Sequence, residues 1–169
     1  LISQYPAFSH TFILREVLGL RMQGANIYVA SINAPDRLDD GLTSDELKER
    51  KRTFFIKSAG PSGAFRALIA LIGIAPWQVL KGLFQAIRLG GMDLRMLPMQ
   101  IAYWVEALML WHWARGERLQ HLHVHFATPA AMVGLLFSRM SGIPFSITIH
   151  GPDEFYDTGK YRLREKFEA

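Results

Sequence analysis

The sequence predicts an α/β fold in which helices cover both faces of a parallel, Rossmann-like sheet. Three observations lead to this prediction. Short apolar segments with strand composition alternate with longer segments of helical periodicity. Two of these alternations, within residues 1–32 and 121–149, have the strand–helix–strand order of a βαβ unit. The 169 residues suffice for one domain with a continuous core, and 50% of them are hydrophobic.

The composition excludes several classes of protein. The chain contains no cysteine, so it has neither disulfides nor thiolate metal ligands. Its formal net charge of +4 is compatible with an anionic membrane surface or a phosphate-bearing substrate. The longest uncharged run in the apolar middle of the chain, residues 67–80, contains Gly73 and Pro76. It is shorter than the ~20 residues that span a bilayer, so no transmembrane helix is expected.

The first unit opens on a strand and continues into a helix over residues 9–23. Ser9 or Thr11 can cap the start of this helix, and Gly24 lies where a C-terminal glycine belongs. A buried strand over residues 26–32 follows. The inward-facing stripe of the helix is predicted to consist of Ile13, Val17 and Leu20.

A polar loop over residues 33–41 leads to a short charged helix. Thr43 and Glu46 have the spacing of a capping box at the start of that helix. A short strand is expected over residues 53–57.

Residues 61–116 show no strand signal and are predicted to form a helical elaboration. Prolines suited to helix starts and glycines suited to helix ends divide the segment into three helices. The starts are Pro61, Pro76 and Pro98, and the ends are Gly90-Gly91 and Gly116. Cations interrupt the apolar runs, as in helices that lie on a membrane, although a core with a charged rim gives the same pattern. These cations are Arg66, Lys81, Arg88 and Arg95.

The second unit begins with a strand over residues 121–126. Thr128 can cap the next helix and Pro129 suits its first turn. A strand over residues 145–149 completes the unit. Ligands bind beyond the carboxyl ends of parallel strands, so the loops that follow three of the strands are expected to converge into a site. These loops are residues 4–11, 126–128 and 150–157.

Each candidate group in these loops also has a purely structural explanation. Ser9 and Thr11 precede a helix N-terminus that can bind phosphate, or they can simply cap it. The alternating histidines at residues 121, 123 and 125 share one strand face, but the outer two are ~13 Å apart and cannot bind one metal ion together. His150 lies at the end of a strand, shortly before Asp153 and Glu154. It can belong to a polar cluster that binds substrate, or simply to a capped turn. No dinucleotide, P-loop or nucleophile-elbow motif is present.

Three motifs, taken together, resemble the N-terminal half of family 4 glycosyltransferases, in particular the exopolysaccharide and colanic-acid type. The motifs are residues 4–13 (QYPAFSHTFI), 121–127 (HLHVHFA) and 148–155 (TIHGPDEF). The family usually has Ser-Glu-Thr-Phe where this chain has Ser-His-Thr-Phe at residues 9–12, so His10 departs from the pattern.

The resemblance implies a GT-B fold, in which two Rossmann-like domains enclose the active site. Residues 1–169 would be the acceptor-side domain, without the C-terminal domain that binds most of the nucleotide-sugar. The implied reaction is sugar transfer, with retention and no required metal or other cofactor, to a glycan or lipid-linked acceptor in cell-surface polysaccharide synthesis. The implied location is the cytoplasm, with peripheral contact at the inner face of an anionic membrane.

The resemblance also implies roles for individual residues. His150, the expected catalytic residue, would contact the donor sugar or its phosphate, and the loop before the first helix would approach the diphosphate. The alternative is a non-enzymatic α/β module that binds a membrane or phosphate through its basic excess. Binding to nucleic acid is not expected, because the cations are scattered. The expected substrate-binding residues are Ser9, His10, Thr11, His125, Phe126, Gly151, Asp153 and Glu154.

Overall fold

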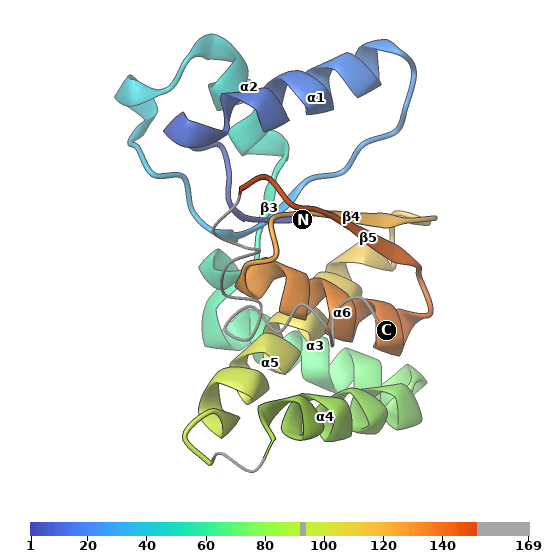
Figure 1. Ribbon diagram of the computed structural model, residues 1–169. Coiled ribbons are helices and arrows are strands. Elements are labelled where there is room, and N and C mark those ends of the chain that lie inside the picture. The colour runs from blue at the N-terminus through green and yellow to red at the C-terminus, as the bar shows by residue number, and fades with distance from the viewer. Residues whose placement is uncertain (92–93, 152–169) are drawn as a thin grey trace.

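The computed structural model describes residues 1–91 and 94–151 of the chain. Its strands are β1 (Ile2–Gln4), β2 (Ala30–Asn33), β3 (Phe54–Phe55), β4 (Leu122–His125) and β5 (Phe145–Thr148). Its α-helices are α1 (Thr11–Met22), α2 (Ser44–Arg52), α3 (Gly60–Ile74), α4 (Pro76–Gly90), α5 (Leu97–Ala114) and α6 (Pro129–Ser141). The strands form a middle layer, with α1 and α2 on one side and α3 to α6 on the other (Figure 1). Helices therefore cover both faces, as the sequence predicts.

All strand pairs are parallel, but the strands form two sheets instead of the single sheet that the sequence predicts. One sheet has the order β1-β2-β3 and the other pairs β4 with β5. Two backbone hydrogen bonds join them: Leu1 donates to the His123 carbonyl at 2.6 Å, and His125 donates to the Leu1 carbonyl at 3.2 Å. Phe126, directly after β4, has a φ of 68°. The strand order across both sheets is β3-β2-β1-β4-β5, with β1 and β4 near the centre.

The apolar side of α1 packs over β1 and β2. Its buried residues Ile13 and Val17 share a core cluster with Ile2, Tyr5 and Val29. Leu20, the third residue of the predicted stripe, lies on the same side of α1 but is 38% exposed. The larger core lies on the opposite face, where α6 packs against β4 and against α4 and α5.

The loop after β1 is held by a buried polar network. Glu49, on α2, is almost fully buried and forms an ion pair with Arg21 of α1. The Tyr5 hydroxyl donates to the same carboxylate at 3.3 Å. Because one carboxylate joins Arg21 near the end of α1, the helix α2 and the loop after β1, this network helps to fix how α1 lies over the strands.

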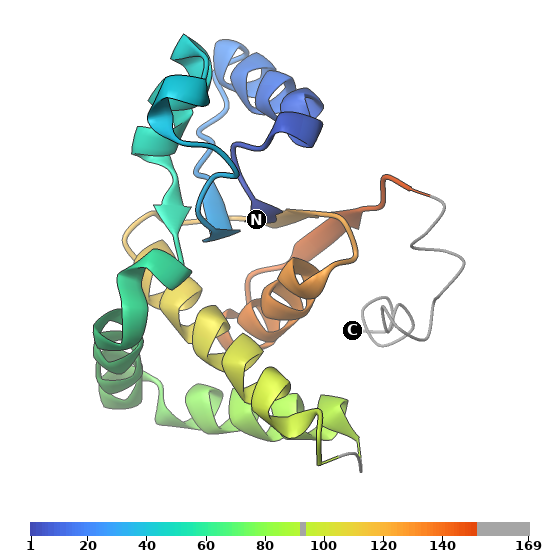
Figure 2. The ribbon, with the colours of Figure 1, turned by 90° about the vertical axis from the view of Figure 1, so that its left-hand side faces the viewer.

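The middle segment contains the three predicted helices. Each of α3, α4 and α5 has a proline in its first two positions, and Gly91 follows α4 with a φ of 66°. Turning the molecule shows α4 as the layer farthest from the strands (Figure 2). Within the described residues, no helix has the length and hydropathy needed to cross a bilayer.

Some of the predicted helix caps and strand ends are confirmed, and others were wrong. The capping box of Thr43 and Glu46 is present, and Gly24 ends α1 with a φ of 88°. Capping of α1 by Ser9 or Thr11 was a wrong prediction. A 3₁₀ turn over Phe8–His10 runs directly into the helix, so that His10 takes the cap position without a side-chain bond. The second strand starts at residue 30 and not at residue 26, because its pairing with β1 and β3 begins there.

Candidate functional site

Residues from the start of α1, from the turn after β4 and from the segment after β5 meet beyond the carboxyl ends of the strands. The Phe12 ring centroid lies 4.7 Å from that of His150, and the Phe126 centroid lies 4.8 Å from the same imidazole. The His10 ring lies 4.8 Å from Phe126. Within the described residues, the structure therefore brings His10, Phe126 and His150 of the three predicted loops together, with His125 beside them at the end of β4.

Backbone geometry accounts for the meeting of β4 and β5 at this edge. His125 is the last residue of β4, and His150 follows two residues after the end of β5. The Phe126 N–H donates to the Thr148 carbonyl at 2.8 Å, which ties the two strand ends together. Phe126 adopts a left-handed backbone conformation that is uncommon for a bulky residue and that directs its ring into the cluster.

The shortest contact in the cluster joins two imidazoles. His125 Nδ1 lies 3.0 Å from His150 Nε2, while His125 Nε2 faces the Glu16 carboxylate at 3.9 Å. A carboxylate attracts an N–H rather than a lone pair, which favours the His125 tautomer protonated on Nε2. His125 Nδ1 then accepts a hydrogen bond from the His150 Nε2–H. In this arrangement His150 Nδ1 carries a lone pair.

The environment keeps two of the strand histidines neutral. The pKa of His125 is lowered to about 4, chiefly by burial, with contributions from positive charge on His123, on the amino group of Leu1 and on His150. Burial is also the largest cause that lowers the pKa of His123. Near pH 7, each of these two imidazoles therefore has one N–H to donate and one nitrogen to accept.

The other strand histidines are bonded to hydroxyl groups of β5. The Ser146 hydroxyl lies 2.8 Å from both His121 Nε2 and His123 Nδ1. The Thr148 hydroxyl lies 3.1 Å from His123 Nε2. These contacts confirm that the alternating histidines share a face, and they match the structural interpretation of hydrogen-bonded strand histidines.

One group of described residues has ligand types that suit a metal ion. The ligand atoms of Glu16, His123 and His125 lie within 4.8 Å of one another. Zinc binds imidazole nitrogen at ~2.0–2.1 Å, so the three side chains would have to close around the ion. Both nitrogens of His123 are already hydrogen-bonded, and a metal would have to replace one of these bonds.

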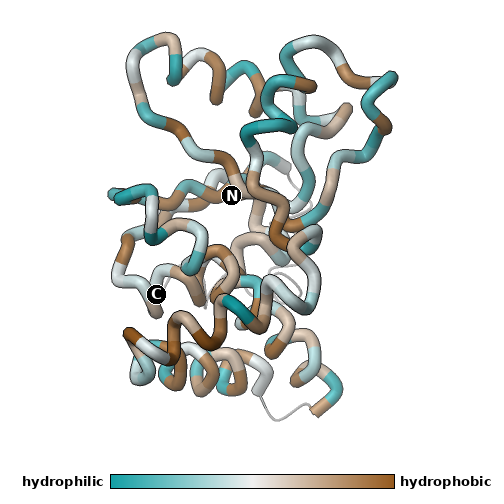
Figure 3. Tube along the Cα trace, turned by 180° about the vertical axis from the view of Figure 1, so that it is seen from behind, coloured by the Kyte–Doolittle hydropathy of each residue, from teal (hydrophilic) through white to brown (hydrophobic). Residues whose placement is uncertain are grey.

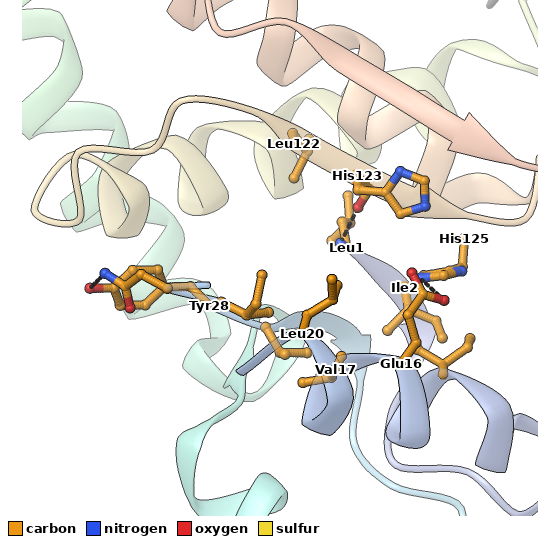
Figure 4. A pocket seen from close by; sticks show the side chains of 13 residues that line it. Leu1, Ile2, Glu16, Val17, Leu20, Tyr28, Leu122, His123 and His125 are labelled. Carbon is orange, nitrogen blue, oxygen red and sulfur yellow. Dashed lines mark hydrogen bonds and ion pairs between the residues drawn. The ribbon is translucent and has the colours of Figure 1, made fainter. Parts of the chain in front are cut away.

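A cavity lies beside these three residues, between α1 and β4 (Figure 4). Its volume is ≈ 180 Å³. His125 and Glu16 lie toward one end of it, and Tyr28 lies toward the other. Its lining consists of Leu1, Ile2, Ile13, Glu16, Val17, Leu20, Asn26, Ile27, Tyr28, Val29, Leu122, His123 and His125.

The remaining predicted site residues are not part of the cluster of rings. Ser9 and Thr11 are exposed, and among the described residues neither hydroxyl bonds a histidine of the cluster. Neither hydroxyl caps α1, so the capping explanation for them was wrong. Gly151 directly follows His150, and Asp153 and Glu154 lie outside the described residues.

Sequence reasoning did not select Phe12 and Glu16 as site residues. They are four residues apart on α1 and therefore share one helix face. That spacing could have indicated both, given a prediction that this face meets the strand ends. His10 could not be assigned a partner from the sequence, and its Nδ1 is buried without a hydrogen-bond partner among the described residues.

Comparisons with known protein families, with curated proteins and with solved structures find no match to this chain. Its function is therefore inferred from its own residues and from the resemblance of its motifs.

Proposed function

We propose that this chain is the acceptor-side domain of a two-domain retaining glycosyltransferase with a GT-B fold. In this proposal it helps to move a sugar from a nucleotide-sugar to a glycan or lipid-linked acceptor in cell-surface polysaccharide synthesis. One observation carries the proposal. His10, His125, Phe126 and His150 come from the three motifs that resemble the family, and they meet at one edge of the strands.

The position and chemistry of the cluster support this proposal. In parallel α/β folds, substrates bind beyond the carboxyl ends of the strands, where these side chains lie. An imidazole can donate to or accept from a sugar hydroxyl, and Phe12 and Phe126 supply apolar surface beside His150. Such a mixture of ring surface and few polar groups is typical of small-molecule sites.

The proposed role of His150 is to hold the donor sugar. With Nε2–H donated to His125, His150 Nδ1 can accept a hydrogen bond from a sugar hydroxyl. A protonated His150 would instead donate from Nδ1 to the departing phosphate. Either contact would orient the donor, and a contact that strengthens as charge develops would lower the barrier.

The proposed role of the Ser9 and Thr11 hydroxyls is to approach the diphosphate. Their exposure and the uncapped start of α1 support this role. The first turn of a helix has N–H groups without intrahelical partners, and its dipole favours an anion. A leaving nucleoside diphosphate has that charge.

The proposal is tested by assaying sugar transfer with and without the second domain. We expect the full-length two-domain enzyme to form a product with the anomeric configuration of the donor. We expect the 169-residue chain alone to transfer no sugar, because one side of the cleft cannot hold donor and acceptor in reacting geometry, an effect worth ~7–11 kcal/mol. Transfer by the isolated chain, or inversion by the full-length enzyme, would contradict the proposal.

A further inference from the structure

Three side chains with metal-binding groups meet between β4 and α1. His123 and His125 alternate along β4 with Leu122 and Val124, whose side chains face α6. The two imidazoles therefore lie on the other face of the strand, and their ring centroids are 4.8 Å apart. Glu16 reaches the same place from α1 (Figure 4). One ligand atom of each of the three side chains lies within 4.8 Å of the other two.

The separation between Glu16 and His125 suits a bridging ion better than a direct contact. Glu16 Oε2 lies 3.9 Å from His125 Nε2, which is too far for a hydrogen bond. Among the described residues, neither atom has a hydrogen-bond partner. Burial is the main reason that the pKa of His125 is lowered to about 4, so near pH 7 this ring is neutral and forms no ion pair with the carboxylate. Two ligands of a tetrahedral zinc ion lie ~3.3–3.4 Å apart, so a closing movement of about half an ångström would seat both.

Hydrogen bonds hold the second nitrogen of each imidazole. His125 Nδ1 lies 3.0 Å from His150 Nε2. His123 Nδ1 lies 2.8 Å from the Ser146 hydroxyl, and His123 Nε2 lies 3.1 Å from the Thr148 hydroxyl. Whichever nitrogen of His123 binds an ion, the other keeps a hydroxyl partner, and the displaced hydroxyl is partly exposed and can bond to water. Histidine ligands of metal ions are usually oriented by such a bond to their second nitrogen.

Charge and access also favour a cation at this place. Glu16 supplies a negative charge, and its side chain is 42% exposed, so an ion can arrive from solvent. The adjoining cavity of ≈ 180 Å³ has room for a water molecule as a further ligand. Hydrophilic residues are prominent in α1, α2 and their loops, whereas hydrophobic residues prevail in the helices on the other side of the strands (Figure 3). The three side chains thus lie on the more polar side of the strand layer.

We propose that Glu16, His123 and His125 bind a zinc ion, with a fourth position open to water. Two imidazoles and one carboxylate form a ligand set that zinc takes at open sites. Magnesium and calcium prefer sites made of oxygen atoms, so neither is the expected ion. The resemblance implies sugar transfer that requires no metal. Zinc binding therefore goes beyond the proposed reaction and does not depend on it.

Zinc would reverse the hydrogen bond between His125 and His150. An ion on His125 Nε2 leaves the proton of that ring on Nδ1, so His125 would donate to His150 Nε2. His150 would then carry its own proton on Nδ1, where the arrangement described above has a lone pair. Each ring keeps one proton, so only the tautomers change. Zinc would thereby turn His150 Nδ1 from an acceptor into a donor at the edge of the candidate site.

Zinc binding is measured by calorimetric titration of the purified 169-residue chain after treatment with a chelator and dialysis. We expect one zinc ion per chain and a midpoint of thermal unfolding that rises with zinc concentration. Loss of a residue that only orients a ligand typically weakens metal binding by ~10–100-fold. Glu16→Gln and His123→Gln each remove a ligand, and each should weaken zinc binding by about 100-fold or more.

Two matched variants serve as controls. Glu117→Gln removes an acid and His112→Gln a histidine, both outside the group of three. Both should bind zinc like the unmodified chain. Excess magnesium should not displace the zinc. Glu16 is exposed and glutamine has nearly the same shape, so Glu16→Gln should keep the fold, which circular dichroism checks for every variant.

The tautomer of His150 gives a second, independent readout. Proton–nitrogen NMR correlation of the imidazoles distinguishes a protonated ring nitrogen from one with a lone pair. We expect zinc to move the His150 proton from Nε2 to Nδ1 in the unmodified chain. In Glu16→Gln the same zinc concentration should leave the His150 tautomer as it is.

Four results would overturn the inference. They are no saturable binding of zinc, binding that Glu16→Gln leaves unchanged, an equal loss in the two controls, and an unchanged His150 tautomer in the zinc-saturated chain. An equal loss in the controls would assign the ion to scattered surface side chains. None of these measurements requires sugar transfer, so failure of the proposed function would leave them interpretable.

Discussion

At the scale of single residues, folding changes the protonation of His125 most clearly. This imidazole is 7% exposed, and its pKa is lowered to about 4 from the ordinary value of 6.5. The groups that act on it are Glu16 on α1, the amino group of Leu1, His150 after β5, and the rings of His10 and His123. Burial outweighs the carboxylate, since Glu16 is partly solvated and does not hydrogen-bond the ring.

We predict that the free energy of unfolding decreases as the pH is lowered from 6.5 toward 4. Below 6.5 the unfolded chain binds a proton at residue 125 that the folded chain does not, so acid favours unfolding. The lowered pKa of His123 acts in the same direction. The loss from His125 should be on the order of 2 kcal/mol after allowance for partial screening. Urea unfolding at several pH values measures it.

The variant His125→Gln removes the titrating group and serves as the comparison. Its unfolding free energy should depend less on pH between 6.5 and 4 than that of the unmodified chain. NMR titration should show the His125 ring neutral down to about pH 5. A His125 ring that titrates near 6.5, or an unchanged pH dependence in His125→Gln, would contradict the assignment.

At the scale of elements, α6 supports β4 through one close approach. Gly134, in α6, lies where an added Cβ would come 2.8 Å from Val124 Cγ2. Val124 is fully buried, and its branched side chain has little freedom to move. The position of β4, and hence of His125 at its end, thus depends on a residue without a side chain.

We predict opposite effects for two glycine-to-alanine changes in helices. Gly134→Ala should lower the unfolding free energy by about 1–3 kcal/mol, because the added methyl group overpacks the contact with β4. Gly73→Ala, on exposed α3, meets nothing within 4 Å and should raise it by about 0.5–1 kcal/mol. Thermal and urea denaturation measure both. Equal effects, or a neutral Gly134→Ala, would show that α6 does not pack as described.

At the scale of the whole molecule, the features that the sequence predicted most accurately are those that depend on residues close together in the chain. The three middle helices follow local proline and glycine signals, and the capping box of Thr43 and Glu46 is complete within four residues. The start of β2 was wrong by four residues, because strand length depends on pairing with β1 and β3. The division into two sheets and the left-handed backbone at Phe126 are not indicated by the sequence.

The candidate site was predictable to the extent that topology determines it. Parallel strands place His125 and His150 at one edge, and the structure brings them within hydrogen-bonding distance. The approach of Glu16 and Phe12 depends instead on how α1 is rotated over the strands. That rotation depends on tertiary contacts such as the buried Glu49 network, which no local pattern reveals.

The central claim is that the cluster at the strand ends holds a sugar donor, and the most direct test is turnover of His150→Ala in the full-length two-domain enzyme. We predict a fall in kcat of ~10²–10³, as is typical for loss of one charge-stabilising contact. His112→Ala, at an exposed histidine of α5, is the matched control and should stay near the unmodified rate. Circular dichroism checks that both variants fold. Near-normal turnover in folded His150→Ala would contradict the claim.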